Sequence, residues 1–426
     1  MLREIIMVNN QKKHFWSFAG SHFAYFFSWA VVYGYLTLWL EQVAGLGGTA
    51  AGLLFSVMAG ISLIFQPIFG IASDRLKFKK TLLAAISASA IFIGPFFQWL
   101  MLPLLGINLY LAVLVAGLYL SFVLNGGVGV IEQYIERASW VNNFEYGHSR
   151  MGGSLAGIVA TLVAGRLFVW NPTAIFWACS IAGTILTILV LFFDKVDVDE
   201  GDLELSTDEE ESKLDRKTIF SIFKLKNFWA LALFYIGAAA IYDVFDQQFI
   251  VYFKSFFENG NDGTIIYSYM ASAQVGLELL LMIPMPYIIN KIGAKRGLII
   301  FGFITFIRIF GSALSPSYPF LIFFRVLAGL EMPLLLVSIM KYISHTFDRK
   351  LYATIYMLGS NFAKQVSVFI FSTISGSLYD GIGFHKTYLL LAGLVLIITI
   401  ISIFTLENDQ KNEHTLTSAE DAVEVR

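Results

Sequence analysis

Residues 15–40 read FWSFAGSHFAYFFSWAVVYGYLTLWL and contain no Asp, Glu, Lys or Arg. A helix needs about 20 mostly apolar residues to cross the hydrocarbon core of a bilayer. The run is longer than the apolar part of a signal peptide, and no small-residue cleavage site follows it. We therefore expect Phe15–Leu40 to be a retained membrane-spanning helix.

The composition of the whole chain extends this interpretation. The 426 residues are 57% hydrophobic and only 14% charged, whereas soluble proteins carry about 25% charged residues. These values exclude a soluble globular protein and a disordered chain, and they favour a membrane protein with many spans. The net charge of −2 argues against a nucleic-acid surface. Cys179 is the single cysteine, so neither an intramolecular disulfide nor a CxxC motif exists.

Similar apolar runs recur, and we predict an all-α membrane protein of twelve spans in two pseudo-symmetric six-helix bundles. The predicted spans are Phe15–Leu40, Gln42–Ser73, Thr81–Ile131 (two spans, divided between Pro103 and Asn108), Met151–Gly165, Leu167–Phe193, Asn227–Phe253, Thr264–Asn290, Gly297–Leu314, Phe320–Ile343, Thr354–Leu378 and Thr387–Leu406. The predicted domains are an N-terminal bundle (1–193), an acidic linker (194–219), a C-terminal bundle (220–406) and a tail (407–426).

The linker is rich in Asp and Glu and has no apolar face to bury, so we expect it to be solvated. Orientation follows the excess of Lys and Arg in the cytoplasmic loops. With both termini inside, most of the 29 basic residues lie on the cytoplasmic side, and only Arg166, Lys254 and Lys386 fall in the outside loops. The sequence thus predicts a multi-pass protein of the cytoplasmic membrane with a cytoplasmic linker and tail.

The two halves also repeat a motif. PIFGIASDRLKFKK (67–80) follows the second predicted span, and PYIINKIGAKR (286–296) follows the eighth. Asp74 of the first copy corresponds to Asn290 of the second, and we predict that Asp74 and Arg75 belong to a gating loop. Two similar bundles predict a central cavity that opens to each side in turn.

Nine ionisable residues lie within predicted spans, where a charge costs roughly 2.5–3.5 kcal/mol on insertion scales. The acids are Glu132, Asp243, Asp246, Glu278 and Glu331, and the bases are Arg150, Arg308, Arg325 and Lys364. One-to-one pairing would leave one carboxyl over, and a lone buried carboxyl tends to hold a proton. Glu331, which has mostly apolar sequence neighbours, is our candidate for this proton carrier, and the alternative is a permanent salt bridge from Glu331 to Arg308 or Arg325.

Two groups of these residues predict binding chemistry. Glu132 is expected to end the fourth helix and Arg150 to begin the fifth, and a carboxylate facing a guanidinium can orient the hydroxyls of a sugar. The alternative is an ion pair that only fixes topology. In YDVFDQQF (242–249), the spacing places Asp243, Asp246 and Gln247 on one helix face, where the alternative is that both acids pair with bases such as Lys364.

The motifs that carry a family resemblance are GIASDRLKFKK, IEQYIER with NFEYGHSR, YDVFDQQF, IINKIGAK and ATIY–FAKQ. By these motifs the chain resembles the oligosaccharide:proton symporters of the major facilitator superfamily, which include lactose, raffinose, melibiose and sucrose permeases. The resemblance covers nearly the whole chain except the linker and the tail. It implies sugar binding by Glu132 and Arg150 and an Asp243–Lys364 charge pair. It also implies an Asp246–Arg325 pair, proton translocation by Glu331, and help from Arg308 in deprotonating Glu331.

Three departures from the family pattern bear on the substrate. Gly157 replaces a tryptophan that stacks on the galactosyl ring in lactose permeases, and Ala328 replaces a histidine. In the eighth span, Val275 stands where the lactose pattern has an acid, and Glu278 appears one turn later, in a string that resembles sucrose permeases. We therefore expect Glu278, Gln247 and Lys364 to join the sugar site.

The sequence predicts a proton-coupled symporter that imports a disaccharide or small oligosaccharide, with a sucrose-type substrate favoured. The alternatives are a lactose or α-galactoside symporter, an uncoupled facilitator, a sugar sensor and a membrane enzyme. The six histidines form no metal-ligand cluster and no catalytic constellation is evident, so we expect no enzyme activity, no metal and no cofactor besides the coupling proton. The expected partners are a sugar, protons and the bilayer, with the monomer as the functional form.

Overall fold

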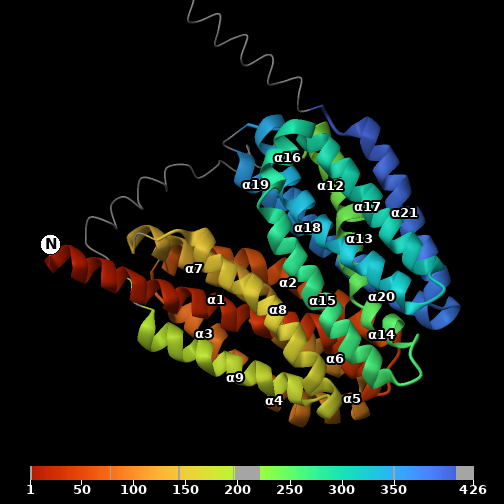
Figure 1. Cartoon of the computed structure of the whole chain (residues 1–426), viewed down its shortest axis with the longest axis horizontal. Helices are drawn as coiled ribbons and strands as arrows, with labels where there is room; N and C mark the ends of the chain where they lie inside the picture. Colours follow the sequence, from red (N-terminus) through yellow and green to blue (C-terminus); the bar gives the residue numbers. More distant parts are fainter. Residues whose placement is uncertain are drawn as a thin grey trace, which may run out of the picture. The chain divides into compact units, whose positions relative to one another are not determined.

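The computed structural model describes residues 2–76, 78–142, 144–194, 196, 221–348 and 351–408, and within these ranges regular structure is helical throughout (Figure 1). The helices of the first part are α1 (Leu2–Gln42), α2 (Gly48–Leu76), α3 (Thr81–Ala90), α4 (Ile93–Pro95), η1 (Phe96–Met101), α5 (Leu102–Ile107), α6 (Leu109–Leu120), η2 (Ser121–Gly126), α7 (Gly127–Val141), α8 (Tyr146–Trp170), α9 (Ala174–Ile188) and η3 (Leu189–Phe193). The helices that follow are α12 (Lys226–Phe234), η5 (Tyr235–Ala239), α13 (Ala240–Asp246), α14 (Phe249–Lys254), α15 (Gly260–Met282), α16 (Met285–Ile292), α17 (Ala294–Leu314), α18 (Tyr318–Thr346), α19 (Tyr352–Tyr356), η7 (Met357–Phe362), α20 (Ala363–Ile382) and α21 (Phe384–Thr405).

Ten of the described helices are long and apolar enough to cross a membrane, and a bent pair, Thr81–Ala90 with Ile93–Ile107, makes up to eleven. The bend of 48° in that pair falls at Ile91–Phe92. The eleventh predicted span, Thr354–Leu378, corresponds to α19, η7 and α20, which carry Lys364 and several serines and are not among these eleven helices. The helical membrane architecture is confirmed, and the count of twelve is reached only if this interrupted helix also spans.

Local sequence explains several helix boundaries. The predicted break between the third and fourth spans is confirmed, because Asn108 adopts an extended backbone and its side-chain oxygen accepts a 3.0 Å hydrogen bond from the Leu111 amide at the start of α6. This is the usual capping role of asparagine. The predicted span Thr264–Asn290 is divided instead into α15 and α16, with a turn at Ile283–Pro284. The π-helical segments η2, η5 and η7 each lie shortly before an ionisable residue of a span.

The chain divides into two compact units by its contacts. Unit 1 lies within Met1–Glu211, Gln247–Ser272 and Ser372–Asp380, and unit 2 within Ser212–Asp246, Ala273–Phe371 and Gly381–Arg426. Helices α15 and α20 therefore contribute one part to each unit. Most of the predicted linker and tail, 197–219 and 409–426, lies outside the described residues.

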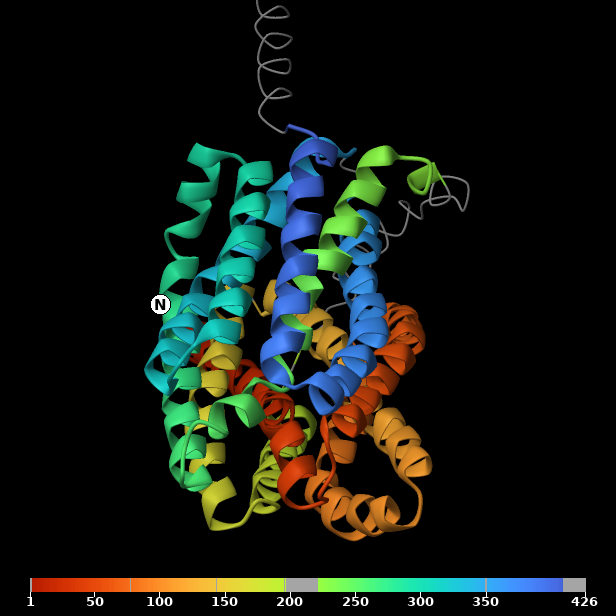
Figure 2. The same cartoon turned by 90° about the vertical axis from the view of Figure 1, so that its right-hand side faces the viewer.

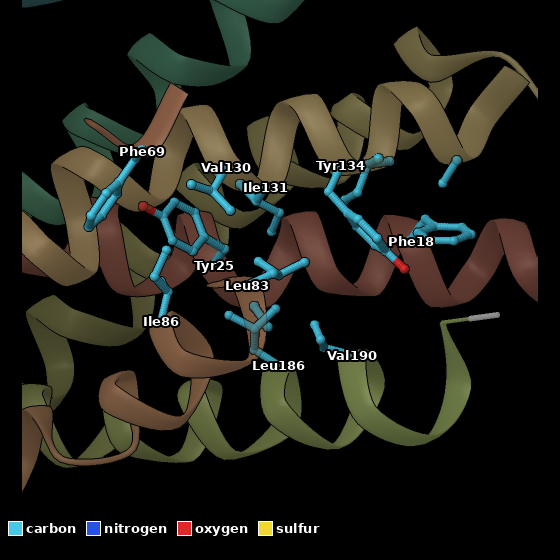
Figure 3. Close-up of a cluster of buried hydrophobic side chains, with 13 residues drawn as sticks. Phe18, Tyr25, Phe69, Leu83, Ile86, Val130, Ile131, Tyr134, Leu186 and Val190 are labelled. Atoms are coloured by element: carbon cyan, nitrogen blue, oxygen red, sulfur yellow. The ribbon is translucent and has the colours of Figure 1, made fainter. Parts of the chain in front are cut away.

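Unit 1 is built around α1, which packs along α8 and α9 (Figure 1). Its hydrophobic core contains aromatic and aliphatic side chains from α1, α2, α3, α7, α9 and η3, and Figure 3 shows how they interdigitate between the helices. Small residues permit close approach, because a Cβ at Gly152 of α8 would collide with the Ala19 carbonyl oxygen of α1. Helices α1 and α8 therefore pack closely at this glycine.

The N-terminus of α2 is capped from another helix of unit 1. The Asp380 carboxylate accepts hydrogen bonds from the amides of Gly48 and Thr49, both 2.8 Å, and from the Thr49 hydroxyl at 2.6 Å. A carboxylate is favourable at this position because the first helical amides have no intrahelical partner and the helix dipole is positive there. Asp380 therefore ties the end of α20 to the start of α2.

Asp194, the first residue of the predicted linker, is not solvated as expected. Its side chain is fully buried, and its carboxylate accepts hydrogen bonds from the hydroxyls of Ser17 and Ser21 on α1. Burial raises the pKa of Asp194 to about 6, although both serines and the Lys80 charge oppose that rise. The prediction that the solvated linker begins at residue 194 is wrong at this position, because α1 supplies buried hydrogen-bond donors to the carboxyl.

In unit 2, α17 packs between α18 and α21, and α21 also contacts α12 (Figure 2). Close approach again uses small residues, since a Cβ at Gly302 of α17 would collide with Thr399 of α21. The long helix α18 continues through Pro333 without ending. This arrangement brings side chains of α13, α17 and α18 together in the interior of unit 2.

Candidate functional site

In unit 1, Arg150 near the start of α8 binds Glu132 of α7. Arg150 Nε donates a 2.8 Å hydrogen bond to Glu132 Oε1, and the guanidinium carbon lies 4.2 Å from the centre of the Phe26 ring. The two charged side chains are 36% and 33% exposed, so the pair is open to a ligand rather than sealed. The predicted proximity of Glu132 and Arg150 is confirmed. The expectation that Glu132 ends its helix is wrong, because α7 continues to Val141.

His22 of α1 packs behind this pair. Its ring is fully buried, its Nδ1 lies 3.0 Å from the Ser149 hydroxyl, and its ring stacks at 6.2 Å on Phe26. The His22 ring therefore packs against the same Phe26 ring that contacts Arg150. The contact of His22 and Phe26 with this pair could not be predicted from the sequence, because both residues lie in a span without Asp, Glu, Lys or Arg.

In unit 2, the buried guanidinium of Arg308 on α17 joins two carboxylates. Arg308 Nη1 lies 2.8 Å from Asp246 Oδ1, and Arg308 Nε lies 2.9 Å from Glu331 Oε2 on α18. Arg325 Nη1 also contacts Asp246 Oδ1, so the predicted Asp246–Arg325 pair is present. Arg308 and Glu331 are fully buried, and Asp246, the third member of this Asp246–Arg308–Glu331 cluster, is 18% exposed.

The sharing of Arg308 corrects one expectation. We expected one-to-one pairing to leave Glu331 as the surplus carboxyl, but Glu331 and Asp246 both bind Arg308. Asp246 has a second cation in Arg325, whereas Glu331 binds the guanidinium of Arg308, which it shares with Asp246. Glu331 thus shares its cation instead of lacking one, and a protonatable carboxyl in this cluster remains chemically reasonable.

Two aromatic rings of α13 enclose Arg308. The guanidinium carbon lies 4.7 Å from the ring centres of both Tyr242 and Phe245. The Tyr242 hydroxyl points toward α15, where Gln274 Nε2 lies 3.5 Å away. Glu278, one turn after Gln274, is half-buried and its charge acts on Tyr242. Tyr242 therefore lies between the predicted sugar ligand Glu278 and the Asp246–Arg308–Glu331 cluster. Tyr242 was not among the site residues that the sequence predicted.

Lys364 of α20 pairs with Asp243 of α13, with 2.9 Å between Lys364 Nζ and Asp243 Oδ2. Each side chain is about one-third exposed.

Gln247 does not share the expected helix face with Asp243 and Asp246, because α13 ends at Asp246 and Gln247 lies in a turn before α14. Its carbonyl oxygen accepts a 2.6 Å hydrogen bond from the Thr37 hydroxyl in unit 1.

We expect neutralisation of Asp243 or Lys364 alone to be more harmful than neutralisation of both. Asp243→Asn or Lys364→Gln leaves one unpaired charge in a span, with a cost of roughly 2.5–3.5 kcal/mol on insertion scales. Initial sugar uptake per folded protein should fall about tenfold or more in each single variant. It should recover substantially in the double variant, because no lone charge is left.

The Glu41–Lys254 pair provides the matched control. Glu41 Oε2 and Lys254 Nζ are 2.9 Å apart near the ends of α1 and α14, where water reaches the charges. Glu41→Gln or Lys254→Gln should change uptake little, as for exposed ion pairs in general. A double Asp243/Lys364 variant that is no more active than either single variant would contradict a simple charge pair.

The predicted gating loop also has a defined contact. Asp74 near the end of α2 binds Arg137 of α7, with Nη2 2.6 Å from Oδ1, while Arg75 is exposed. In unit 2, Asn290 of α16 accepts a hydrogen bond from Lys341 of α18. Asp74 and Asn290, which correspond in the two copies of the motif, thus each bind a basic side chain, Arg137 and Lys341. Neither basic residue was predicted from the sequence.

Among the described residues, no group of three His, Cys, Asp or Glu side chains is arranged to hold a metal ion. The site residues fall into two sets. Glu132 and Arg150 form an open pair in unit 1, and the Asp246–Arg308–Glu331 cluster lies in unit 2 with Arg325, Asp243, Lys364 and Glu278 around it.

A family model described as "LacY proton/sugar symporter" matches residues 7–420. The chain belongs to this family. A raffinose permease of Escherichia coli is 38% identical over 395 residues, which are 92% of this chain and 93% of that protein. A melibiose permease of Enterobacter cloacae is 39% identical over 398 residues (93% and 94%), and a sucrose permease of Escherichia coli is 30% identical over 399 residues (93% and 95%).

Solved structures show the same fold. The nucleoside transporter NupG superposes with a TM-score of 0.78 at 14% identity, covering 92% of this chain and 99% of that one. A D-xylose–proton symporter gives a TM-score of 0.63 at 16% identity, covering 94% and 98%. The protein therefore has the major facilitator fold, and its relatives are transporters rather than enzymes.

Proposed function

We propose that this member of the proton/sugar symporter family imports a disaccharide or small oligosaccharide together with a proton. The observation that carries the proposal is the Asp246–Arg308–Glu331 cluster, in which two carboxylates share one fully buried guanidinium. A proton on Glu331 breaks its ion pair with Arg308 while Arg308 keeps Asp246 as a partner, and loss of the proton restores the Glu331–Arg308 pair. That is the behaviour required of a coupling site.

The Glu132–Arg150 pair has the chemistry of the sugar site. A sugar offers many hydroxyl donors and acceptors and no charge, and an ion pair orients such groups by charge-assisted hydrogen bonds. The pair is one-third exposed although it lies in spanning helices, and the Phe26 ring supports the guanidinium. Gln247, Lys364 and Glu278 are the further candidates for sugar contacts.

Transport follows an alternating-access cycle. The outward-facing form binds a proton at Glu331 and then the sugar, reorients, and releases the sugar inside. Glu331 then loses its proton while Arg308 stabilises the resulting carboxylate. Coupling requires that sugar and proton together favour reorientation over either one alone.

A sucrose-type substrate is favoured by Glu278, which lies near the cluster, and by Val275 at the position of the acid in the lactose pattern. A second candidate, an α-galactoside such as melibiose or raffinose, is supported by the higher identity to the melibiose and raffinose permeases than to the sucrose permease. Competition of unlabelled sucrose, lactose, melibiose, raffinose and maltose against labelled uptake separates the two.

Addition of the transported sugar to de-energised cells that express the protein should make the medium alkaline, because protons enter with the sugar. Control cells carry the empty vector. A protonophore should abolish both the pH change and sugar accumulation. Sugar entry without a pH change, unaffected by the protonophore, would instead identify an uncoupled facilitator, the alternative that Ala328 supports.

The proposal includes the placement of the protein. The charge distribution supports insertion in the cytoplasmic membrane with both termini, the acidic linker and the Asp74–Arg137 contact inside. Each chain has its own sugar and proton residues, which supports a functional monomer. We propose that the proton is the coupling ion and that no further cofactor takes part.

A further inference from the structure

Helix α1 carries two aromatic rings, Trp29 and Tyr33, that stack on each other. Their centres are 4.5 Å apart and their planes differ by 26°. Both residues are only partly buried, whereas most large side chains around them on α1 are buried. The pair therefore retains accessible ring surface in the middle of a spanning helix.

This surface does not belong to a lipid-facing stripe. Outer helices of unit 1 display rows of exposed aliphatic side chains, such as Ile64, Ile68 and Ile71 on α2. Between Phe15 and Gln42 of α1, the one exposed large hydrophobic side chain is Trp16, at 71%. Between these two residues α1 is thus an inner helix of unit 1 and presents no row of exposed aliphatic side chains.

The Trp29–Tyr33 pair lies on the same face of α1 as Phe26, the ring that contacts Arg150. Phe26, Trp29 and Tyr33 are spaced by three and four residues and therefore share one helix face. Phe26 packs near Gly153 of α8, and the hydroxyl of Tyr35 donates to the Thr161 carbonyl, so α1 and α8 run side by side in the same direction. Trp29 consequently lies at the level of Ala156 and Gly157 of α8, about one turn beyond Phe26.

Neighbouring helices hold the Tyr33 ring in place. Its hydroxyl donates to Asn125 Oδ1 in η2, and Asn125 Nδ2 donates over 2.7 Å to the Ser62 hydroxyl of α2. The Phe55 ring packs on Tyr33 at 5.9 Å. Both rings are partly exposed and the Tyr33 ring is held by its neighbours, so the pair is preorganised to receive a flat ligand surface.

We propose that Trp29, supported by Tyr33, is the stacking surface for one ring of the sugar whose hydroxyls Glu132 and Arg150 bind. The C–H face of a sugar ring is apolar while its rim is polar, so it suits an aromatic plane beside a charged pair. At the same level α8 has Gly157 and offers no ring, which leaves α1 to supply the aromatic surface. This inference rests on the proposed function.

The test measures sugar binding to the purified full-length protein, with sucrose, melibiose, raffinose and lactose as probes. Trp29→Ala should weaken binding at least about tenfold, the loss expected for a removed stacking contact. Trp29→Phe should retain most of the affinity because it keeps a ring. Trp16→Ala is the matched control, because Trp16 is on the same helix but is not part of the Phe26–Trp29–Tyr33 face, and this variant should bind as the wild type does.

Tryptophan fluorescence distinguishes contact from a structural role. Sugar should change the emission of the wild type and of Trp16→Phe, and this change should be lost or greatly reduced in Trp29→Phe. Because Trp29→Phe keeps the core filled, it decides the question even if Trp29→Ala fails to fold.

Two failures are distinguishable. If the wild type binds none of the four sugars, the proposed function is overturned. If the wild type binds one of them, while Trp29→Ala binds it equally well or Trp29→Phe keeps an unaltered fluorescence change, the stacking surface is refuted and the symporter assignment stands.

Discussion

A Glu331→Gln variant is expected to exchange sugar across the membrane at close to the wild-type rate and to fail in accumulating it. Glutamine has nearly the size of glutamic acid and mimics its protonated form. In the variant, Arg308 keeps Asp246 as its charged partner, and because Asp246 also binds Arg325 the group carries one net positive charge, the same charge as the wild type with a proton on Glu331. The step that requires deprotonation of residue 331 is lost, while reorientation with bound sugar continues.

The measurement compares two assays in one set of membrane vesicles. Exchange of labelled internal sugar for unlabelled external sugar reports reorientation of the loaded protein, and uptake driven by a proton gradient reports coupling. Ser338→Ala, which removes another buried polar group of α18, is the matched control and should perform normally in both assays. Uphill accumulation by Glu331→Gln would refute Glu331 as the proton carrier.

Apolar run length predicted most of the fold, because a spanning helix must satisfy its backbone internally and expose apolar side chains. Interruptions were harder to predict. The turn at Gln247 follows an apolar and acidic stretch without Gly or Pro, so its position depends on neighbours such as Thr37, which binds the Gln247 carbonyl. Asp194 looked solvated in an acidic sequence, and only the serines of α1 explain its burial.

Site residues were predictable as a set because a charge in a span needs a partner or water. The choice of partner was less predictable. Sequence separation does not reveal that Arg308 is shared by Asp246 and Glu331. The rings that flank the arginines, Phe26 and Tyr242, carry no signal among so many aromatic residues. Such contacts follow from helix packing, which pattern alone does not define.

An Arg150→Lys variant, which keeps the charge, is expected to lose at least about 100-fold in sugar affinity. Arg150 uses its Nε to bind Glu132, lies against the Phe26 ring, and also makes a side-chain hydrogen bond with Tyr146. An ammonium group is a single compact charge and cannot make the planar fork and the ring contact together. Hydrogen bonds to charged groups contribute about 1.5–3 kcal/mol each, so loss of one or two gives an effect of this size.

Arg166→Lys is the matched control for this substitution. Arg166 makes the same type of contact, with its guanidinium carbon 5.7 Å from the Tyr269 ring and Nη2 3.0 Å from the Tyr269 hydroxyl, but it lies at the exposed end of α8. Its replacement should leave affinity within about threefold of the wild type, as expected for an exposed contact. Equal affinities for Arg150→Lys and Arg166→Lys would show that the Glu132–Arg150 pair fixes topology instead of binding sugar. A loss confined to Arg150→Lys, with normal folding, would show that the guanidinium fork itself recognises the sugar.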